Sequence, residues 1–114
     1  MCAFMIPERI AKLEATLRNS AGIPEATRQE LLDLVASLRA EVAPIVTTHG
    51  EEAHDIADSA EVAVEAAVRR EDEPEKAARA LEGLVASVRA FETTHPRLAE
   101  VVDRLALTLS NMGI

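Results

Sequence analysis

Apolar residues recur three and four positions apart along most of the chain, and this is the spacing of one face of an α-helix. The large apolar residues form four stripes: Ile10, Leu13 and Leu17; Leu31, Leu34, Val35, Leu38 and Val42; Leu81, Leu84, Val85, Val88 and Phe91; and Leu98, Val101, Val102, Leu105, Leu109 and Met112. With a further stripe of small residues in the middle of the chain, the pattern predicts helices over residues 7–19, 24–43, 49–70, 74–93 and 96–112. The connections between them are short, so consecutive helices should run antiparallel. The sequence therefore predicts a single all-α domain over residues 1–114, an antiparallel helical bundle of about five helices.

The predicted third helix differs from the others because its stripe consists mainly of alanine. The stripe comprises Ala53, Ile56, Ala57, Ala60, Ala63, Val64 and Ala67. Small side chains bury less area per turn but allow another backbone to approach closely. We therefore expect this helix to be central or to lie at a tight crossing. Gly83, in the middle of the predicted fourth helix, is either tolerated there or marks a close contact with a neighbouring chain.

The expected helix ends coincide with residues that start or stop helices. Pro24 and Pro96 suit the first turn of a helix, and Pro44 should stop the second one. Thr48 and Asp72 each precede a glutamate by three positions, which is the spacing of a capping box.

Charged residues support the same helices, because an acidic residue four positions before a basic one stabilises a helix. Five pairs have this order: Glu8/Lys12, Glu14/Arg18, Glu65/Arg69, Glu75/Arg79 and Glu100/Arg104. We expect these pairs on solvated helix faces.

One phrase occurs twice in the chain. LLDLVASLRA (31–40) and LEGLVASVRA (81–90) agree at seven of ten positions, and a Thr-Thr-His follows each segment, at 47–49 and 93–95. This order suggests a duplicated helical hairpin, with helix two pairing with three and four with five, and the first helix as an extra arm. Duplication and chance similarity between aliphatic helices both remain open.

Composition excludes several functional classes. Apolar residues make up 48% of the chain but aromatic residues only 2%, and the formal net charge is −8. Such a surface repels phosphate backbones and anionic lipids, so neither a nucleic acid nor a membrane is an expected partner. The apolar segment before Pro7 is too short for a signal peptide, and the single cysteine, Cys2, cannot form an internal disulfide. We expect a cytoplasmic protein.

One segment, THGEEAHDIAD (48–58), concentrates groups that bind metals. Glu51 and His54 have the Glu-x-x-His spacing of di-iron bundles, but those sites need two such motifs and two further carboxylates. Glu51 and Glu52 are also explained by the helix dipole, which favours carboxylates in the first turn. A surface metal held by His49, His54 and His95 remains an alternative.

Other chemistry is not indicated. There is no Ser/His/Asp or Cys/His arrangement with supporting context, and the glycines do not form a phosphate-binding loop. We therefore expect no enzyme, no catalytic residue and no cofactor.

The segment FETTHPRLAEVVDRLALTLSNMGI (Phe91–Ile114) resembles the ending of a family of short bacterial all-helical proteins, a domain of unknown function. The shared features are Phe-Glu-x-x-His-Pro and a terminal Asn-Met-Gly-Ile, here Phe91, Glu92, His95, Pro96, Asn111, Met112, Gly113 and Ile114. The segment THGEEAHDIADSAEVAVEAAVRRE also resembles the middle of longer members. The resemblance implies a helical fold and assigns no catalytic residue. In this motif His95 should cap the fifth helix, with a ligand or proton-switch role as the alternative, while Phe91 closes the core over the corner.

These features predict a non-enzymatic helical module for protein–protein interaction or self-association. Amphipathic helices with a thin core gain from a second subunit, so we expect a homodimer through faces of helices one, two or four. A basic partner protein is an alternative, because the negative charge would steer it. The alternative function is a metal-binding helical-bundle enzyme or sensor that uses the His49, Glu51, Glu52 and His54 cluster.

Overall fold

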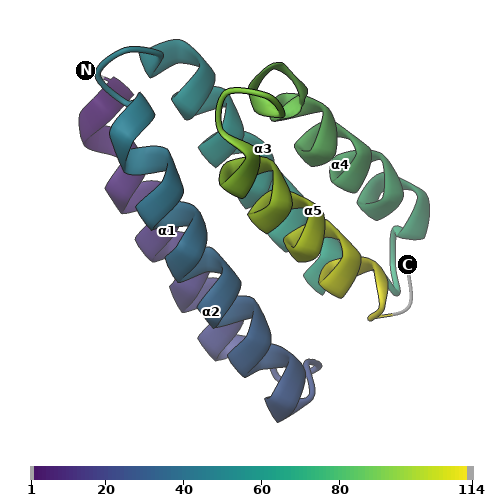
Figure 1. The fold of residues 1–114 in the computed structure, drawn as a ribbon. Coiled ribbons are helices and arrows are strands. Elements are labelled where there is room, and N and C mark those ends of the chain that lie inside the picture. Colours follow the sequence, from purple (N-terminus) through teal and green to yellow (C-terminus); the bar gives the residue numbers. More distant parts are fainter. Residues whose placement is uncertain (1, 113–114) are drawn as a thin grey trace.

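A computed structural model describes residues 2–112 of the chain, with side chains from Ile6 to Met112. It has five α-helices, α1 (Cys2–Asn19), α2 (Glu25–Val42), α3 (Gly50–Val68), α4 (Pro74–Ser87) and α5 (Pro96–Ser110), and two 3-10 turns, η1 (Ala43–Ile45) and η2 (Arg89–Phe91). No strand occurs within the described range, and consecutive helices run up and down (Figure 1). The predicted all-α antiparallel bundle is confirmed.

Two helix boundaries differ from the prediction by more than two residues. α1 begins at Cys2 rather than at residue 7, and Pro7 lies inside it. The extra turn places Ile6 in the core, one turn before Ile10. Burial of Ile6 favours the helical conformation here, even though Pro7 has no amide hydrogen to donate. α4 ends at Ser87 rather than at residue 93, and the chain tightens into η2, which places Phe91 in the core.

The predicted capping boxes are wrong. The residues at the N-cap positions of α3 and α4 are His49 and Glu73, and neither makes a side-chain capping hydrogen bond. His95 occupies the N-cap position of α5, as expected from the motif, but its side chain does not bond the helix amides. Pro96 lies in the first turn of its helix as predicted, whereas Pro24 is the residue just before α2.

The helices form a closed ring in the order α1, α3, α4, α5, α2, and each packs mainly on its two neighbours in that order. α4 and α5 form the predicted hairpin. The predicted pairing of the second and third helices is wrong, because α2 and α3 make little contact and α1 lies between them (Figure 1). α1 is thus part of the ring and not an extra arm.

A ring of five helices cannot alternate direction at every seam, and the one parallel seam lies between α1 and α3. Ion pairs cross this seam: Arg9 contacts Asp58 at 2.7 Å and Glu61 at 3.2 Å, and Lys12 contacts Glu61 at 3.0 Å. Hydrogen bonding to Glu61, together with the charges of Glu61 and Glu65, raises the pKa of Lys12 above its usual value. These contacts hold the two helices in register.

Most of the predicted ion pairs within helices are absent among the described residues. Of the five predicted pairs, the structure contains the one between Glu100 and Arg104, with 3.8 Å between Oε1 of Glu100 and Nε of Arg104. Lys12 pairs across to α3 instead, and Glu14 pairs with Arg39 of α2. These charges therefore join neighbouring helices, which their spacing along one helix does not reveal.

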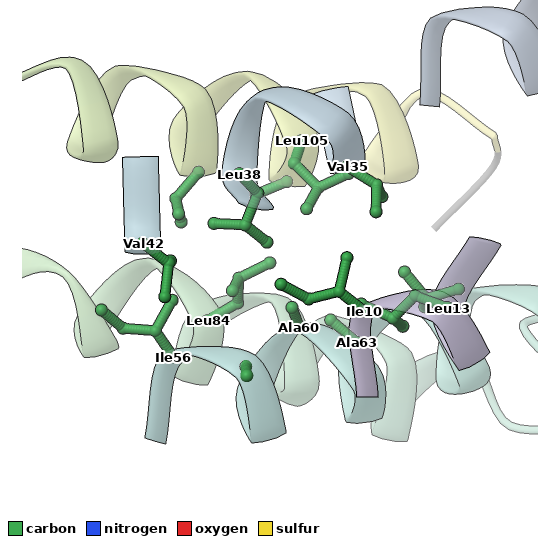
Figure 2. Packing of buried hydrophobic residues seen from close by; sticks show 14 of the residues in the cluster. Ile10, Leu13, Val35, Leu38, Val42, Ile56, Ala60, Ala63, Leu84 and Leu105 are labelled. Atoms are coloured by element: carbon green, nitrogen blue, oxygen red, sulfur yellow. The ribbon is translucent and has the colours of Figure 1, made fainter. Parts of the chain in front are cut away.

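The core is aliphatic and follows the predicted stripes. Figure 2 shows the buried side chains of all five helices converging, with Ala60 and Ala63 of α3 facing Ile10 of α1. The alanine stripe of α3 is fully buried, as expected for a helix that packs between two others. The repeated phrase buries equivalent positions in its two copies, Leu31 with Leu81 and Leu38 with Val88.

Two arginines close helix ends at the end of the bundle opposite η1 and η2. Arg28 of α2 donates to the carbonyl oxygens of Leu17, Ser20 and Ile23, where α1 ends. Arg70 donates to the carbonyl oxygens of Ala67 and Met112, where α3 and α5 end. Both arginines donate to carbonyl groups at or just beyond the carboxyl ends of these helices, where the regular pattern of helical hydrogen bonds stops.

Candidate functional site

The structure distributes the candidate metal ligands over two helix starts. His49 is exposed just before α3, Glu51 and Glu52 are exposed in its first turn, and His54 is half-buried one turn later. His95 is half-buried just before α5. Within residues 6–112, no three His, Cys, Asp or Glu side chains lie close enough together to hold one metal ion. The five candidates therefore do not form one cluster.

The structure does bring His49 and His95 together, around Phe91. Each imidazole meets the phenyl ring in an edge-to-face arrangement with a centroid distance of 5.5 Å, at 87° for His49 and 76° for His95. Such a geometry matches the positive edge of one ring to the negative face of the other. The predicted role of Phe91, to close the core at this corner, is confirmed by its burial.

The two corners are built alike. Nδ1 of His49 lies 2.9 Å from Oγ1 of Thr48, and Nδ1 of His95 lies 3.1 Å from Oγ1 of Thr94. The amide of each histidine donates to a carbonyl four residues earlier, at 2.7 Å in both corners. The repeated Thr-Thr-His thus specifies a repeated turn, in which the threonine orients the imidazole and the histidine precedes a helix. This arrangement explains the motif structurally.

A second feature lies on the solvent-facing side of α5, beside α4. The two helices border an apolar groove of about 480 Å³, lined by Ala78, Leu81, Glu82, Val85, Arg89, Asp103, Ala106, Leu107 and Ser110. The buried and half-buried apolar residues of its lining are Ala78, Leu81, Val85 and Ala106, whereas the charged residues Glu82, Arg89 and Asp103 are exposed. A smaller recess of about 420 Å³ lies on the other flank of α5, against α2, and Leu107 borders both.

Leu107 stands out on this surface. Among residues 6–112, two large apolar side chains are exposed, Leu107 at 61% and Val62 at 46%. The apolar stripes of the sequence do not include Leu107. The residue lies half a helical turn from Leu98, Leu105 and Leu109, so it points away from the core that they form. A leucine outside the apolar stripe of its helix is the sequence feature that could have pointed to this surface.

The helices expected at a dimer interface differ in how much apolar surface they expose. The large apolar residues of α1 from Ile6 onward, which are Ile6, Ile10, Leu13 and Leu17, are buried inside the same chain. α4, which was one of the helices expected at a dimer interface, lines the groove with Leu81 and Val85. α5 was not among the helices expected at a dimer interface, but it carries Leu107, the most exposed leucine.

The architecture defines the class: a small all-α protein whose helices enclose one aliphatic core. A family model described as a domain of unknown function (DUF4404) matches residues 31–114, and the chain belongs to that family. The matched part runs from the interior of α2 onward, so α1 lies outside it although it is part of the packed ring. No curated protein and no solved structure matches the chain. Within the described residues, no helix combines the length and apolar character needed to cross a bilayer.

Proposed function

We propose that this protein is a non-enzymatic helical module for protein–protein interaction, and that the α4–α5 groove with Leu107 is its working surface. The observation that carries the proposal is the exposure of Leu107 beside an aliphatic groove. An apolar patch of this kind, rimmed by polar residues, is typical of an interaction site. A leucine at the outermost position of a helix otherwise costs solubility and contributes nothing to the core.

The proposal extends to the setting of the protein. It is a bacterial family member that ends in Asn-Met-Gly-Ile and acts in the cytoplasm, where its single cysteine stays reduced. The last two residues of that ending, Gly113 and Ile114, lie outside the described residues. A homodimer is the favoured assembly, and a basic protein is the alternative partner because the chain carries a net charge of −8.

The rival function is a metal-binding bundle that uses His49, Glu51, Glu52 and His54. Against it, no three His, Cys, Asp or Glu side chains within residues 6–112 lie close enough together to hold one metal ion. Elemental analysis of the purified protein separates the two functions. Stoichiometric iron, manganese or zinc would favour the rival.

Site-specific photo-cross-linking in the native host tests the interaction module. A photoreactive amino acid replaces Glu82 on the groove rim, and a matched control carries it at Asp55 on the exposed side of α3. We expect a discrete cross-linked product from position 82 and none from position 55. If position 82 gives no product, or if both positions give the same one, the proposed surface is wrong.

A further inference from the structure

We propose that two copies of this chain exchange their α1 helices, so that α1 of each copy lies on α2 and α3 of the other. The surface involved is the α1-binding face, which is the side of α2 and α3 that α1 covers within one chain. The α4–α5 groove of the proposed function takes no part in this exchange. The protein thus has a second interaction surface, whose occupant is a helix of its own sequence.

The contacts of α1 identify the helix that fits the α1-binding face. Four aliphatic side chains of α1 are buried there: Ile6, Ile10, Leu13 and Leu17. Arg9 and Lys12 pair with acidic residues of α3, so charge fixes the direction and the register of the helix. A second copy offers the same apolar stripe and the same two cations. Exchange of an identical element is a low-cost route to a dimer, because the contacts of that element are kept.

The family match distinguishes α1 from the other helices. It covers residues 31–114, and therefore all of α3, α4 and α5 and most of α2, but none of α1. Within residues 2–112, α1 is joined to the other helices by one connection, residues 20–24. When α1 leaves its place, the path of the chain through the matched helices is unchanged. α1 is therefore the helix that we expect to leave its own chain.

The seam between α1 and α3 contains buried polar atoms without a partner. Within residues 6–112, these are Nε of Arg9 and Nδ1 of His54. Arg9 belongs to α1, and His54 precedes Asp58 by four positions, so it lies on the same face of α3 as a partner of Arg9. A buried polar atom without a hydrogen-bond partner costs free energy. Opening of this seam gives both nitrogens access to water, which offsets part of the loss of apolar contact.

The connection between α1 and α2 determines the balance between the closed chain and the exchanged dimer. The contacts of α1 with α2 and α3 are the same in both forms, so they cancel from the equilibrium. In the closed chain, Arg28 of α2 donates to the carbonyl oxygens of Ser20 and Ile23, which lie within the connection. The connection must extend when α1 moves to another copy, and these two bonds are then lost. The bond from Arg28 to Leu17 is kept, because Leu17 belongs to the exchanged helix.

Thiol cross-linking between separate chains tests the exchange. In a Cys2→Ala background, Lys12→Cys and Glu65→Cys are made in different full-length chains, one of which carries a size tag. The two chains are mixed, incubated and treated with a short bis-maleimide. Nζ of Lys12 lies 3.9 Å from Oε1 of Glu65 within one chain, so we expect a cross-link between the two chains once α1 has exchanged. Glu82→Cys on the exposed side of α4 replaces Glu65→Cys in the matched control and should give no product above background.

A substitution in the seam separates exchange from ordinary docking of two closed chains. Glu61→Gln removes ion pairs that α1 makes in both forms. It should therefore speed the appearance of the cross-link by about 3-fold or more and leave the monomer–dimer equilibrium unchanged. A change in the dimer dissociation constant without a change in rate would mean that α1 makes different contacts in the dimer, and would overturn the exchange.

Substitutions at the connection should have the opposite effect. Arg28→Ala removes two bonds that only the closed chain contains, so it should lower the dimer dissociation constant in sedimentation equilibrium by about 10-fold or more. Deletion of Ala21 and Gly22 shortens the path of α1 back to its own α2 and should favour the dimer further. Arg18→Ala, at an exposed position of α1, should leave the equilibrium unchanged. Circular dichroism checks that each variant keeps its helices.

Two results would overturn the exchange of α1. One is a cross-link yield no higher than that of the Glu82→Cys control. The other is a dimer whose dissociation constant responds neither to Arg28→Ala nor to the deletion in the connection, because docking of closed chains does not involve the connection. Neither result bears on the α4–α5 groove, which the photo-cross-link from position 82 tests separately.

Discussion

Replacement of Arg28 by alanine should destabilise the protein through the end of α1. The Arg28 guanidinium donates to the carbonyl oxygen of Leu17 at 3.1 Å and to those of Ser20 and Ile23, and its side chain is 19% exposed. It also pairs with Glu25 at 2.7 Å, but that carboxylate side chain is 69% exposed, so water screens the pair and it contributes little.

The magnitude follows from these contacts. A hydrogen bond from a charged donor contributes about 1.5–3 kcal/mol, and a cation at a helix carboxyl end adds about 0.3–1 kcal/mol. Because Ala21 and Gly22 are exposed, water replaces part of what the arginine provides. Alanine matches arginine in helix propensity, so that effect is small. We expect a loss of about 2 kcal/mol, or a decrease in Tm of about 8 °C for a chain of this size.

Urea denaturation followed by circular dichroism measures this loss. Arg18→Ala is the control, because Arg18 is likewise basic and lies in the last turn of α1, but its side chain is exposed. It should change the free energy of unfolding by less than about 0.5 kcal/mol. Glu25→Ala isolates the ion pair and should cost less than about 1 kcal/mol. An Arg28→Ala variant as stable as Arg18→Ala would refute the capping argument.

Three further predictions concern α3, α4 and the parallel seam. Gly83→Ala should stabilise the chain by about 0.5–1 kcal/mol in thermal unfolding, because a Cβ there meets no atom within 4 Å; a loss would reveal a neighbour at that position. Ala60→Leu should cost about 1–3 kcal/mol by overpacking α3, whereas Ala36→Leu on the exposed side of α2 should be near neutral; equal effects in urea denaturation would contradict the tight crossing. The pKa of Lys12 is raised above 10.5 in the folded state, so its stabilising contribution is complete below that value and is lost as the pH rises through the folded-state pKa. Wild type should therefore lose more stability than Glu61→Gln when the pH is raised past 10.5, and parallel pH profiles would rule the linkage out.

The candidate site could be predicted in part. The Thr-Thr-His repeat was visible in the sequence, but the meeting of His49 and His95 at Phe91 was not. That meeting requires the α2–α3 and α4–α5 connections to lie at the same end of the bundle. The alternative metal site rested on the concentration of potential ligands in residues 48–58 and on the Glu-x-x-His spacing of Glu51 and His54. The structure instead places His49 at a turn and His54 half-buried a turn later.

The capping boxes failed for a local reason. Thr48 has the right spacing from a glutamate, but its hydroxyl pairs with the imidazole of His49, and the helix starts one residue later than the capping box requires. Most of the predicted ion pairs within single helices do not form, because contacts between helices compete with them. Lys12 and Glu14 have partners four residues away, yet they bond across to α3 and α2, where a second acidic or basic group lies closer.

The sequence by itself determined that the chain is helical and which face of each helix is buried, because the period of 3.6 residues is a local property that each helix carries within itself. It also determined the alanine face of α3 and the aliphatic character of the core. Only the tertiary structure decided that α1 separates α2 from α3, and that α4 and α5 leave a groove beside Leu107. Which helices become neighbours depends on the path of the connections and on the packing of all five stripes at once, and no single stripe encodes it.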